Sequence, residues 1–270
     1  MARGNYPVCK SITLVHEGGT SNHKDDPGGF TSRGVTAAAG AGYRKRMGLP
    51  PKAVNKWTAA EVDAFYHDDY WLGVSAELLP WGVDLATFDA GVNSGVSRGA
   101  KWLQRGIGVR RDGNVGPLTL AAVSSVPGDV LVKRICGYRL SFVQGLGTFK
   151  VFGRGWSRRI ADIEAKGVAM WLRNNGTSAG KTADRMAREA EAASGKAMGQ
   201  AKGGSVAGAG GAATGVGDYV AGGTGWLLVV LGVAVVVGAL LLVKSRQNAA
   251  RAAAYGAAMD EHMLDEMAGQ

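Results

Sequence analysis

One carboxylate stands where acid chemistry could be carried out. Glu17 ends a short apolar stretch and is followed by two glycines, which let the backbone turn sharply. Asp25, Asp26 and Thr31 then follow on a polar, glycine-punctuated segment that is too irregular for a continuous helix. Glycoside hydrolysis requires a carboxylic acid that protonates the glycosidic oxygen and a second group that handles water or the glycosyl cation. Glu-Gly-Gly alone is more typical of a surface helix that ends at a glycine. The hypothesis of a glycoside hydrolase site therefore depends on the whole stretch 14–36.

The elements that must position this stretch are predicted to be mostly helical. Thr36 is a good N-cap for an alanine-rich helix, and Thr58 with Glu61 forms a capping-box pattern that begins another. Sustained strand alternation is nearly absent, so we expect at most a small β-hairpin near residues 20–36. The expected helices cover residues 10–16, 37–47, 59–70, 84–92, 99–105, 117–126, 130–146 and 156–172.

The positive charge of the chain is concentrated in its first two thirds. Residues 1–175 contain 23 Lys and Arg against 14 Asp and Glu, a net charge of +9, whereas the remaining residues carry 8 against 8. A basic globular domain favours an anionic partner such as nucleic acid, an acidic membrane face or a cell-wall polymer. The histidines and the two cysteines, Cys9 and Cys136, have no metal-ligand spacing, so we expect no metal and no cofactor. We expect the two thiols to be free, and a bridge between Cys9 and Cys136 is the alternative left open.

The composition changes abruptly after Arg173. Residues 176–224 are predicted to be a Gly/Ala-rich linker, within which 183–202 could form a mixed-charge helix and Gly199–Gly225 contains 11 glycines in 27 residues. Trp226 to Val243 then gives 18 residues without a charge, which would span roughly 27 Å as a helix. We therefore expect residues 225–243 to be a single transmembrane helix, and 244–270 to be a short charged tail.

Several sequence blocks together resemble a known enzyme family. The blocks HEGG, DPGGFTSRGVT, FYHDDYW and FDAGVNSG resemble the glycoside hydrolase family 108 lysozyme-like muramidases of phages and prophages. KWLQRGIGV and DGNVGPLTLAAV resemble the predicted peptidoglycan-binding segment that usually follows in those enzymes. The resemblance covers roughly residues 8–175 and implies a lysozyme-like domain, with a catalytic segment at 1–95 and a peptidoglycan-binding-like segment at 96–175. It also implies cleavage of the glycan strand, with Glu17 as the catalytic acid.

The sequence leaves more than one candidate for the second catalytic group that would act with Glu17. Phage-type lysozymes of another family carry Glu, eight residues, Asp, five residues and Thr, and eight residues separate Glu17 from Asp26. Asp26 would remain ionised to steady the sugar cation or position water, although a turn role before Pro27 fits it equally well. The third position departs from that pattern, because Ser32 occupies it and Thr31 precedes it, so either hydroxyl is a candidate. Asp25 is the less favoured carboxylate.

The substrate-binding candidates are Tyr70, Trp71 and Asn93. The two aromatic side chains could line a saccharide groove, although core packing is favoured for at least one of them. Asn93 could bind an N-acetyl group, or it could simply cap a helix end. The Asp112-Gly113 block could contact the wall, although a turn followed by a Pro-initiated helix explains it structurally.

The combined prediction is a membrane-tethered peptidoglycan hydrolase, a phage- or prophage-derived muramidase. Its partners would be peptidoglycan, the lipid bilayer and phage lysis or virion proteins, and nucleic acid is not expected because no single-strand groove pattern is present. Basic residues after the apolar segment favour the cytoplasm, which would place the catalytic domain on the periplasmic side of the bacterial inner membrane. The alternative is a virion-associated protein that opens the envelope locally during genome entry.

Overall fold

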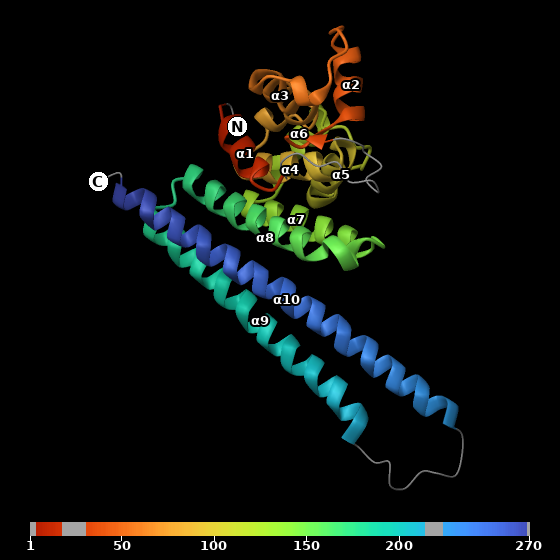
Figure 1. Cartoon of the computed structure of the whole chain (residues 1–270). Helices are drawn as coiled ribbons and strands as arrows, with labels where there is room; N and C mark the ends of the chain where they lie inside the picture. The colour runs from red at the N-terminus through yellow and green to blue at the C-terminus, as the bar shows by residue number, and fades with distance from the viewer. Residues whose placement is uncertain (1–3, 18–30, 214–223, 269–270) are drawn as a thin grey trace. The chain divides into compact units, whose positions relative to one another are not determined.

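The computed structural model describes residues 4–17, 31–213 and 224–268, with side chains for 4–17, 31–203 and 235–261. The chain divides into two compact units, Met1–Thr177 and Ser178–Gln270 (Figure 1). Asp25 and Asp26 lie outside the described residues. The two units are considered separately below.

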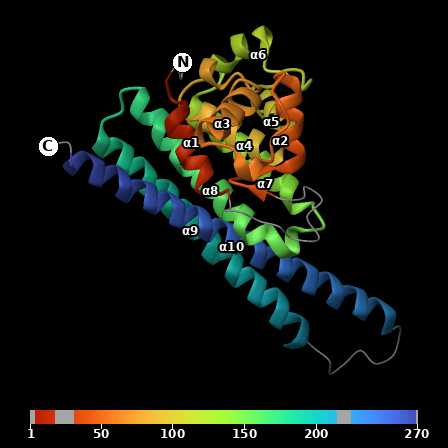
Figure 2. The same cartoon turned by 45° about the horizontal axis from the view of Figure 1, so that its top comes forward.

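The first unit consists of helices and one small hairpin (Figures 1 and 2). Its α-helices are α1 (Tyr6–Leu14), α2 (Ala37–Arg46), α3 (Ala59–Phe65), α4 (Val83–Ser94), α5 (Val96–Ile107), α6 (Pro117–Ala122), α7 (Gly128–Gln144) and α8 (Phe149–Asn174). The remaining elements are the strands β1 (Thr31–Ser32) and β2 (Val35–Thr36), the 3-10 turns η1 (Val54–Lys56), η3 (Ala76–Leu78) and η4 (Val123–Ser125), and the π-helix η2 (Tyr66–Trp71).

Helix α4 is the centre of this unit. Every residue from Val83 to Gly91 is buried, which includes two aspartates, and α1, η2, α5, α7 and α8 all pack against α4. A helix that is buried all round must satisfy its polar side chains internally, because water cannot reach them. The acidic residues of α4 therefore need partners from the surrounding helices, and this requirement shapes the site described below.

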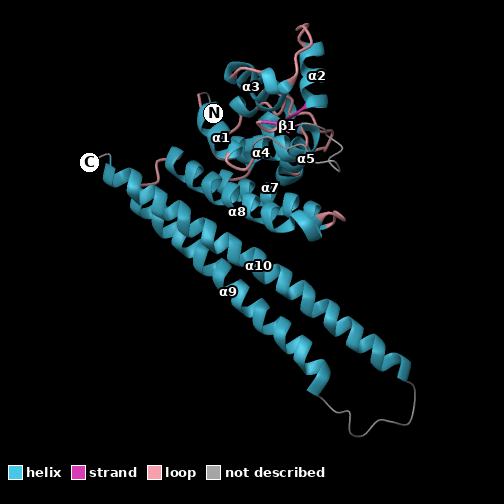
Figure 3. Cartoon of the chain, viewed as in Figure 1, coloured by secondary structure: helices cyan, strands magenta, loops and turns pink. Residues whose placement is uncertain are grey.

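The local signals predicted from the sequence are present. Thr36 caps α2 by accepting from the Ala39 amide at 3.2 Å, and Thr58 with Glu61 forms a complete capping box at α3. The hairpin pairs Thr31 with Thr36 and Ser32 with Val35, and it is the one strand pair among the described residues (Figure 3). The expectation of a mostly helical domain with a small hairpin is thus confirmed.

Several helix boundaries differ from expectation, and two of the differences are described here. The helix predicted to run through Tyr70 changes after Phe65 into a π-helix, whose wider turn lets Tyr66 and Trp71 both reach the interior. Helix α8 begins at Phe149, seven residues before the predicted start at Trp156. Both cysteines are buried.

The second unit consists of two long helices that pack along each other, α9 (Ala179–Ala213) and α10 (Thr224–Ala268). Ser245 donates to the Ala197 carbonyl at 2.8 Å, and Asn248 donates to Gln200 at the same distance. The prediction of flexible chain from Gly199 is wrong over residues 199–213, which are helical. Glycines that destabilise an isolated helix allow a second helix to approach closely, and Gly203 faces Leu241 in this way.

The expected transmembrane helix is not supported by the described residues. Among them, no helix is both long and apolar enough to cross a membrane. Part of the apolar segment Trp226–Val243, residues 226–234, lies outside the residues whose side chains are described.

Candidate active site

Glu17 lies just beyond the end of α1 and lines a pocket. Its amide donates to the Leu14 carbonyl at 3.1 Å, which continues the last turn of the helix, and its side chain is 20% exposed. The pocket has a volume of about 360 Å³. Its walls come from α1, α3 and the hairpin turn, and the lining residues are Lys10, Leu14, Glu17, Arg33, Ala59, Val62 and Asp63. The carboxylate is therefore reachable by a ligand while most of its surface is protected from water.

A chain of buried ion pairs holds Glu17 in this position. Arg159 of α8 donates to Glu17 Oε1 at 2.6 Å and also to both carboxylate oxygens of Asp89, at 2.8 to 3.2 Å. Arg139 of α7 pairs with the other side of Asp89 and donates to Asn93 Oδ1 at 3.0 Å. The two guanidinium groups balance the two carboxylates, so the network carries no net charge when Glu17 is ionised.

The network is buried, and burial and pairing act in opposite directions on its groups. Burial alone would raise the pKa of Asp89, but Arg139 and Arg159 outweigh that effect and hold the pKa below its usual value. Burial would likewise lower the pKa of Arg159, and Asp89 and Glu17 raise it instead. Asp89 and Arg159 are therefore both charged at neutral pH, and removal of either would leave a buried charge with too few partners.

The hairpin turn brings backbone up against Glu17. Arg33 and Gly34 both have positive φ, 50° and 77°, as the two central residues of a type I′ turn require. A side chain at Gly34 would collide with the Tyr66 hydroxyl and come within 3.3 Å of Glu17 Oε2. Burial and the nearby Glu17 raise the pKa of Tyr66, so its hydroxyl stays protonated beside the acid.

Tyr70 and Trp71 have different surroundings, although they are adjacent in the sequence. Trp71 is 2% exposed and packs on Phe88 with ring centroids 5.5 Å apart, so core packing applies to it and no ring face is open to a sugar. Tyr70 is half-buried, with its ring 5.8 Å from that of Tyr66, and burial, Asp69 and then Glu17 raise its pKa. Of the two aromatic candidates, Tyr70 is the one that lies near the acid.

The remaining predicted residues are only partly brought together. Asn93, at the end of α4, accepts from Arg139 and from the Ser94 hydroxyl at 3.4 Å, so its side chain joins the ion network. Thr31 is half-buried in β1, and Ser32 is buried. Asp26, the predicted second carboxylate, lies outside the described residues, as does Asp25.

Sequence reasoning missed the residues that hold Glu17. Asp89 was part of the FDAGVNSG block, but Arg139 and Arg159 belong to helices far along the chain, and neither has a local spacing that links it to Glu17. The available signal was a charged residue on an otherwise apolar helix face: Arg159 is followed at once by Ile160 and lies four residues before Ile163. Such a residue has to be paired when the face is buried.

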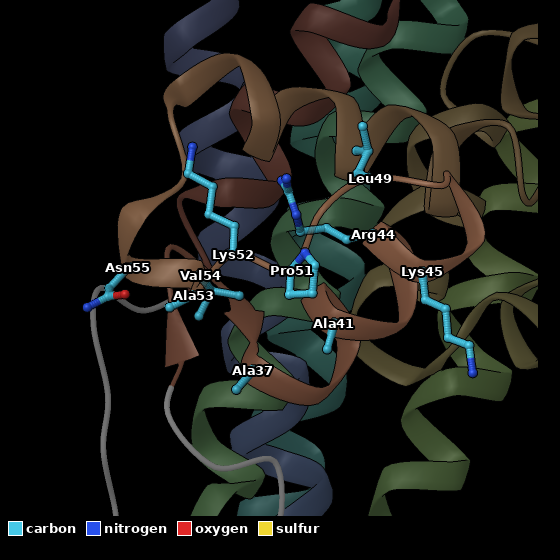
Figure 4. A pocket seen from close by; sticks show the side chains of 10 residues that line it. All are labelled: Ala37, Ala41, Arg44, Lys45, Leu49, Pro51, Lys52, Ala53, Val54 and Asn55. Atoms are coloured by element: carbon cyan, nitrogen blue, oxygen red, sulfur yellow. The ribbon is translucent and has the colours of Figure 1, made fainter.

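A second, larger pocket lies between α2 and the loop that leads to η1. It has a volume of about 900 Å³ and is lined by Ala37, Ala41, Arg44, Lys45, Leu49, Pro51, Lys52, Ala53, Val54 and Asn55 (Figure 4). No carboxylate is among these residues, so the pocket offers no acid for glycoside chemistry. The smaller pocket with Glu17 is therefore the candidate active site. Among the described side chains, no group of three His, Cys, Asp or Glu residues could hold a metal ion.

The Asp112-Gly113 block is organised from within. The Gln104 amide donates to Asp112 Oδ1 at 2.7 Å and to the Asn114 carbonyl at 3.0 Å, and its oxygen accepts from the Gly113 amide at 2.9 Å. These polar groups are used to form the turn before α6, which supports the structural explanation of the block.

Comparisons with known proteins agree with this arrangement. The family model of glycosyl hydrolase 108 matches residues 11–95, and that of a predicted peptidoglycan domain matches residues 98–161. A solved structure described as "Structure of Brucella abortus SagA" is similar at 35% sequence identity and a TM-score of 0.57; the similarity covers 62% of this chain and 96% of that chain. No curated protein matches the chain. The chain therefore belongs to the glycosyl hydrolase 108 family and is a lysozyme-like peptidoglycan hydrolase.

Proposed function

We propose that the chain is a muramidase, which cleaves the glycan strand after N-acetylmuramic acid, with Glu17 as the catalytic acid. The observation that carries this proposal is a partly exposed carboxylate that lines a pocket and is fixed from behind by a buried ion network. The other carboxylate of the pocket, Asp63, is already occupied by Lys10 and by the Tyr6 hydroxyl. The Glu17 side chain is 20% exposed against 45% for Asp63, so Glu17 is better protected from water and is our choice of proton donor.

The network supports acid catalysis in a specific way. As Glu17 gives its proton to the glycosidic oxygen, a carboxylate develops opposite Arg159, whose guanidinium is already in place at 2.6 Å. An interaction that strengthens as charge develops lowers the barrier, because it favours the transition state over the ground state. The shared partner Asp89 fixes the guanidinium so that little reorganisation is needed.

A second group must stabilise the glycosyl cation or position water. Asp26 is our candidate for this role from the sequence, with Thr31 as a hydroxyl that could orient a water molecule. Thr31 begins the strand that leads into the turn at Gly34, beside Glu17, which is consistent with a position close to the reacting bond. Tyr70 is the proposed aromatic contact to the substrate.

The test compares two Glu→Gln variants on purified cell walls. Glu17→Gln keeps an oxygen for Arg159 but cannot donate a proton, so turbidity clearing should fall at least about 100-fold with an unchanged circular dichroism spectrum. Glu77→Gln, in η3 outside the pocket, should clear walls as the wild type does. Clearing by Glu17→Gln within a few fold of wild type would remove Glu17 as the acid.

The bond that is cut can be identified from the products. Soluble fragments released by the wild type are reduced with borohydride and analysed by mass spectrometry. A muramidase leaves N-acetylmuramic acid at the reducing end, so muramitol should be found. Glucosaminitol at that position would mean that the neighbouring glycosidic bond is cleaved and that the muramidase proposal is wrong.

We also propose, from the sequence, that Trp226–Val243 associates with a lipid bilayer and holds the enzyme on the wall side of the inner membrane. Large aliphatic side chains are exposed along α10 from Val235 to Val243, and such a surface favours contact with an apolar phase. The phage-like sequence blocks support a phage or prophage derivation, in which lysis or virion proteins would give access to the wall. The full chain should float with lipid vesicles in a density gradient, and a chain that stays at the bottom would contradict the anchor.

A further inference from the structure

Three aromatic side chains form a stripe at the beginning of α8. Phe149, Phe152 and Trp156, here called the aromatic stripe, occupy positions i, i+3 and i+7, which share one face of a helix. The ring centroids of Phe152 and Trp156 are 5.7 Å apart, and those of Phe149 and Trp156 are 6.4 Å apart. Phe152 is 54% exposed, and the other two rings are half-buried. An exposed ring cluster of this kind is typical of a surface that contacts a ligand.

Along the same helix face, the stripe leads to Arg159, which holds Glu17. Arg159 follows Trp156 by three residues, and the buried Ile163 follows four residues later. At a rise of about 1.5 Å per residue, Trp156 lies about 4.5 Å and Phe149 about 15 Å along the axis from Arg159. Because Arg159 holds Glu17, the stripe extends away from the catalytic acid over a length that accommodates more than one sugar ring.

Cationic side chains flank the rings. Lys150, Arg154 and Arg158 are all exposed on the same turns of α8. Ring faces pack on the apolar C–H faces of sugars, and guanidinium groups pair with carboxylates in a bidentate geometry. Peptidoglycan presents both features, because its sugars carry peptide stems that end in carboxylates.

We propose that the aromatic stripe binds the glycan strand of peptidoglycan beside the glycosidic bond whose oxygen Glu17 protonates, while the flanking cations pair with stem carboxylates. The proposal rests on the proposed function for the position of the reacting bond. The stripe lies within residues 98–161, which match the peptidoglycan domain. In the same segment, the polar groups of the Asp112 turn form hydrogen bonds with Gln104. The stripe is therefore the better candidate for the wall contact of that domain.

Single-stranded nucleic acid also binds to rings flanked by cations. The neighbourhood favours the glycan, because a nucleic acid that followed the stripe toward Arg159 would bring its phosphates to Glu17, a carboxylate. Oligothymidylate is therefore included below as a competitor.

The test measures binding without cleavage, in the full-length Glu17→Gln protein, by co-sedimentation with purified sacculi. Adding Phe152→Ala should weaken binding about three- to tenfold, because one open ring face is lost. Adding Val151→Ala is the matched control, since Val151 is the preceding residue, is 74% exposed and lies off the stripe. Equal affinity of the Phe152→Ala and Val151→Ala proteins would overturn the proposal.

Two further outcomes separate this proposal from the proposed function. If the chain with Glu17 intact cleaves walls and Phe152→Ala leaves the apparent KM unchanged, the proposed role of the stripe is wrong and the proposed function is retained. If the chain with Glu17 intact releases no reducing ends but Phe152→Ala still weakens sacculus binding, the function fails and the stripe stands. Displacement of sacculi by oligothymidylate from the Glu17→Gln protein, but not from its Phe152→Ala derivative, would assign the stripe to nucleic acid and overturn the proposal.

Discussion

At the scale of single residues, the active site depends on a guanidinium that serves two carboxylates. Arg159 bonds Asp89 through Nε and Nη2 and reaches Glu17 through Nη1, so its planar fork fixes the direction of the Glu17 side chain. Arg139 also pairs with Asp89, and its other partner is Asn93. Both arginines therefore stabilise the network, but of the two it is Arg159 that orients Glu17. Comparing their variants distinguishes the two effects.

Replacing each arginine by lysine tests this separation. Arg159→Lys keeps the charge but loses the fork, so Glu17 should be misplaced and turnover on walls should fall at least about tenfold. Arg139→Lys should lower the melting temperature to a similar extent and leave turnover much closer to wild type. Equal losses of turnover in the two variants would mean that Arg159 acts through the fold alone. Turnover and thermal melting are measured on the same preparations.

A second buried acid, Asp84, serves no catalytic role in the proposed mechanism. It is fully buried at the beginning of α4, where it accepts from the Asn5 side chain at 2.6 Å and from the Leu85 amide at 2.7 Å. Burial raises its pKa to about 6, against the lowering effect of these hydrogen bonds. Asn5 Oδ1 is buried without a hydrogen-bond partner among the described residues, which leaves an acceptor beside Asp84.

Asp84→Asn is expected to stabilise the protein at neutral pH. The folded pKa of about 6 lies above the ordinary aspartate value of 3.8, so the ionised form is disfavoured by about 3 kcal/mol on folding. The contribution of Asp84 to stability is thus intact below pH 4 and is lost as the pH rises through 6. The amide of the variant can donate to Asn5 Oδ1. Urea unfolding should give an advantage of up to about 3 kcal/mol at pH 7.5 that shrinks toward pH 4, and a pH-independent difference would contradict the assignment.

At the scale of elements, the hairpin turn forms one wall of the pocket and packs against Glu17. Its two-residue type I′ turn requires positive φ at Arg33 and Gly34, and the absence of a side chain at Gly34 makes room for Tyr66 and Glu17. Gly108 at the end of α5 has the same φ, 77°, but nothing lies within 4 Å of where its Cβ would be. Substituting Gly34 and Gly108 by alanine therefore distinguishes the effect of backbone strain from that of a collision beside Glu17.

Gly34→Ala should damage activity and Gly108→Ala should not. Both variants incur the cost of an alanine at positive φ, about 1 kcal/mol, which thermal melting will detect. Only Gly34→Ala forces the Tyr66 hydroxyl and the Glu17 side chain to move, so wall clearing should fall about tenfold or more for this variant. Comparable clearing by the two variants would argue against close packing of the turn on Glu17.

Local signals in the sequence predicted the elements of the first unit well. Thr36, Thr58 and Glu61 each satisfy orphan amides at a helix start, and this depends only on neighbours within three residues. The ion network could not be predicted in the same way, because Glu17, Asp89, Arg139 and Arg159 are brought together only by the packing of α4, α7 and α8. The position of Glu17 was predictable from its block, and its partners were not.

For the glycine-rich stretch that begins at Gly199, the prediction from local composition was wrong. Glycine lowers the stability of an isolated helix by about 1 kcal/mol per residue, so composition alone predicted a flexible chain from Gly199. In the structure α9 continues to Ala213 alongside α10, where small residues such as Ala193 and Ala197 are buried at the helix contact. Pairing with a second helix overrides intrinsic propensity, and a sequence window does not contain the partner.

At the scale of the whole molecule, chemistry and charge belong to one unit. The described residues of the ion network, the pocket and the aromatic stripe all lie within Met1–Thr177. Residues 1–175 also carry the entire +9 excess charge, which favours an anionic polymer such as the wall. The helices α1, α5, α7 and α8, which pack on α4, all belong to the same unit and supply its core.

The fragment Met1–Thr177 should therefore fold and act on walls by itself. We expect one cooperative thermal transition, because a unit of this size with its own core unfolds as a whole. Its turnover on solubilised wall fragments should match that of the full chain within about twofold, since none of the proposed catalytic residues lies beyond Thr177. Vesicle flotation should be lost, because the apolar segment of α10 is absent. A fragment that is folded by circular dichroism yet at least tenfold slower than the full chain would mean that α9 and α10 contribute to catalysis.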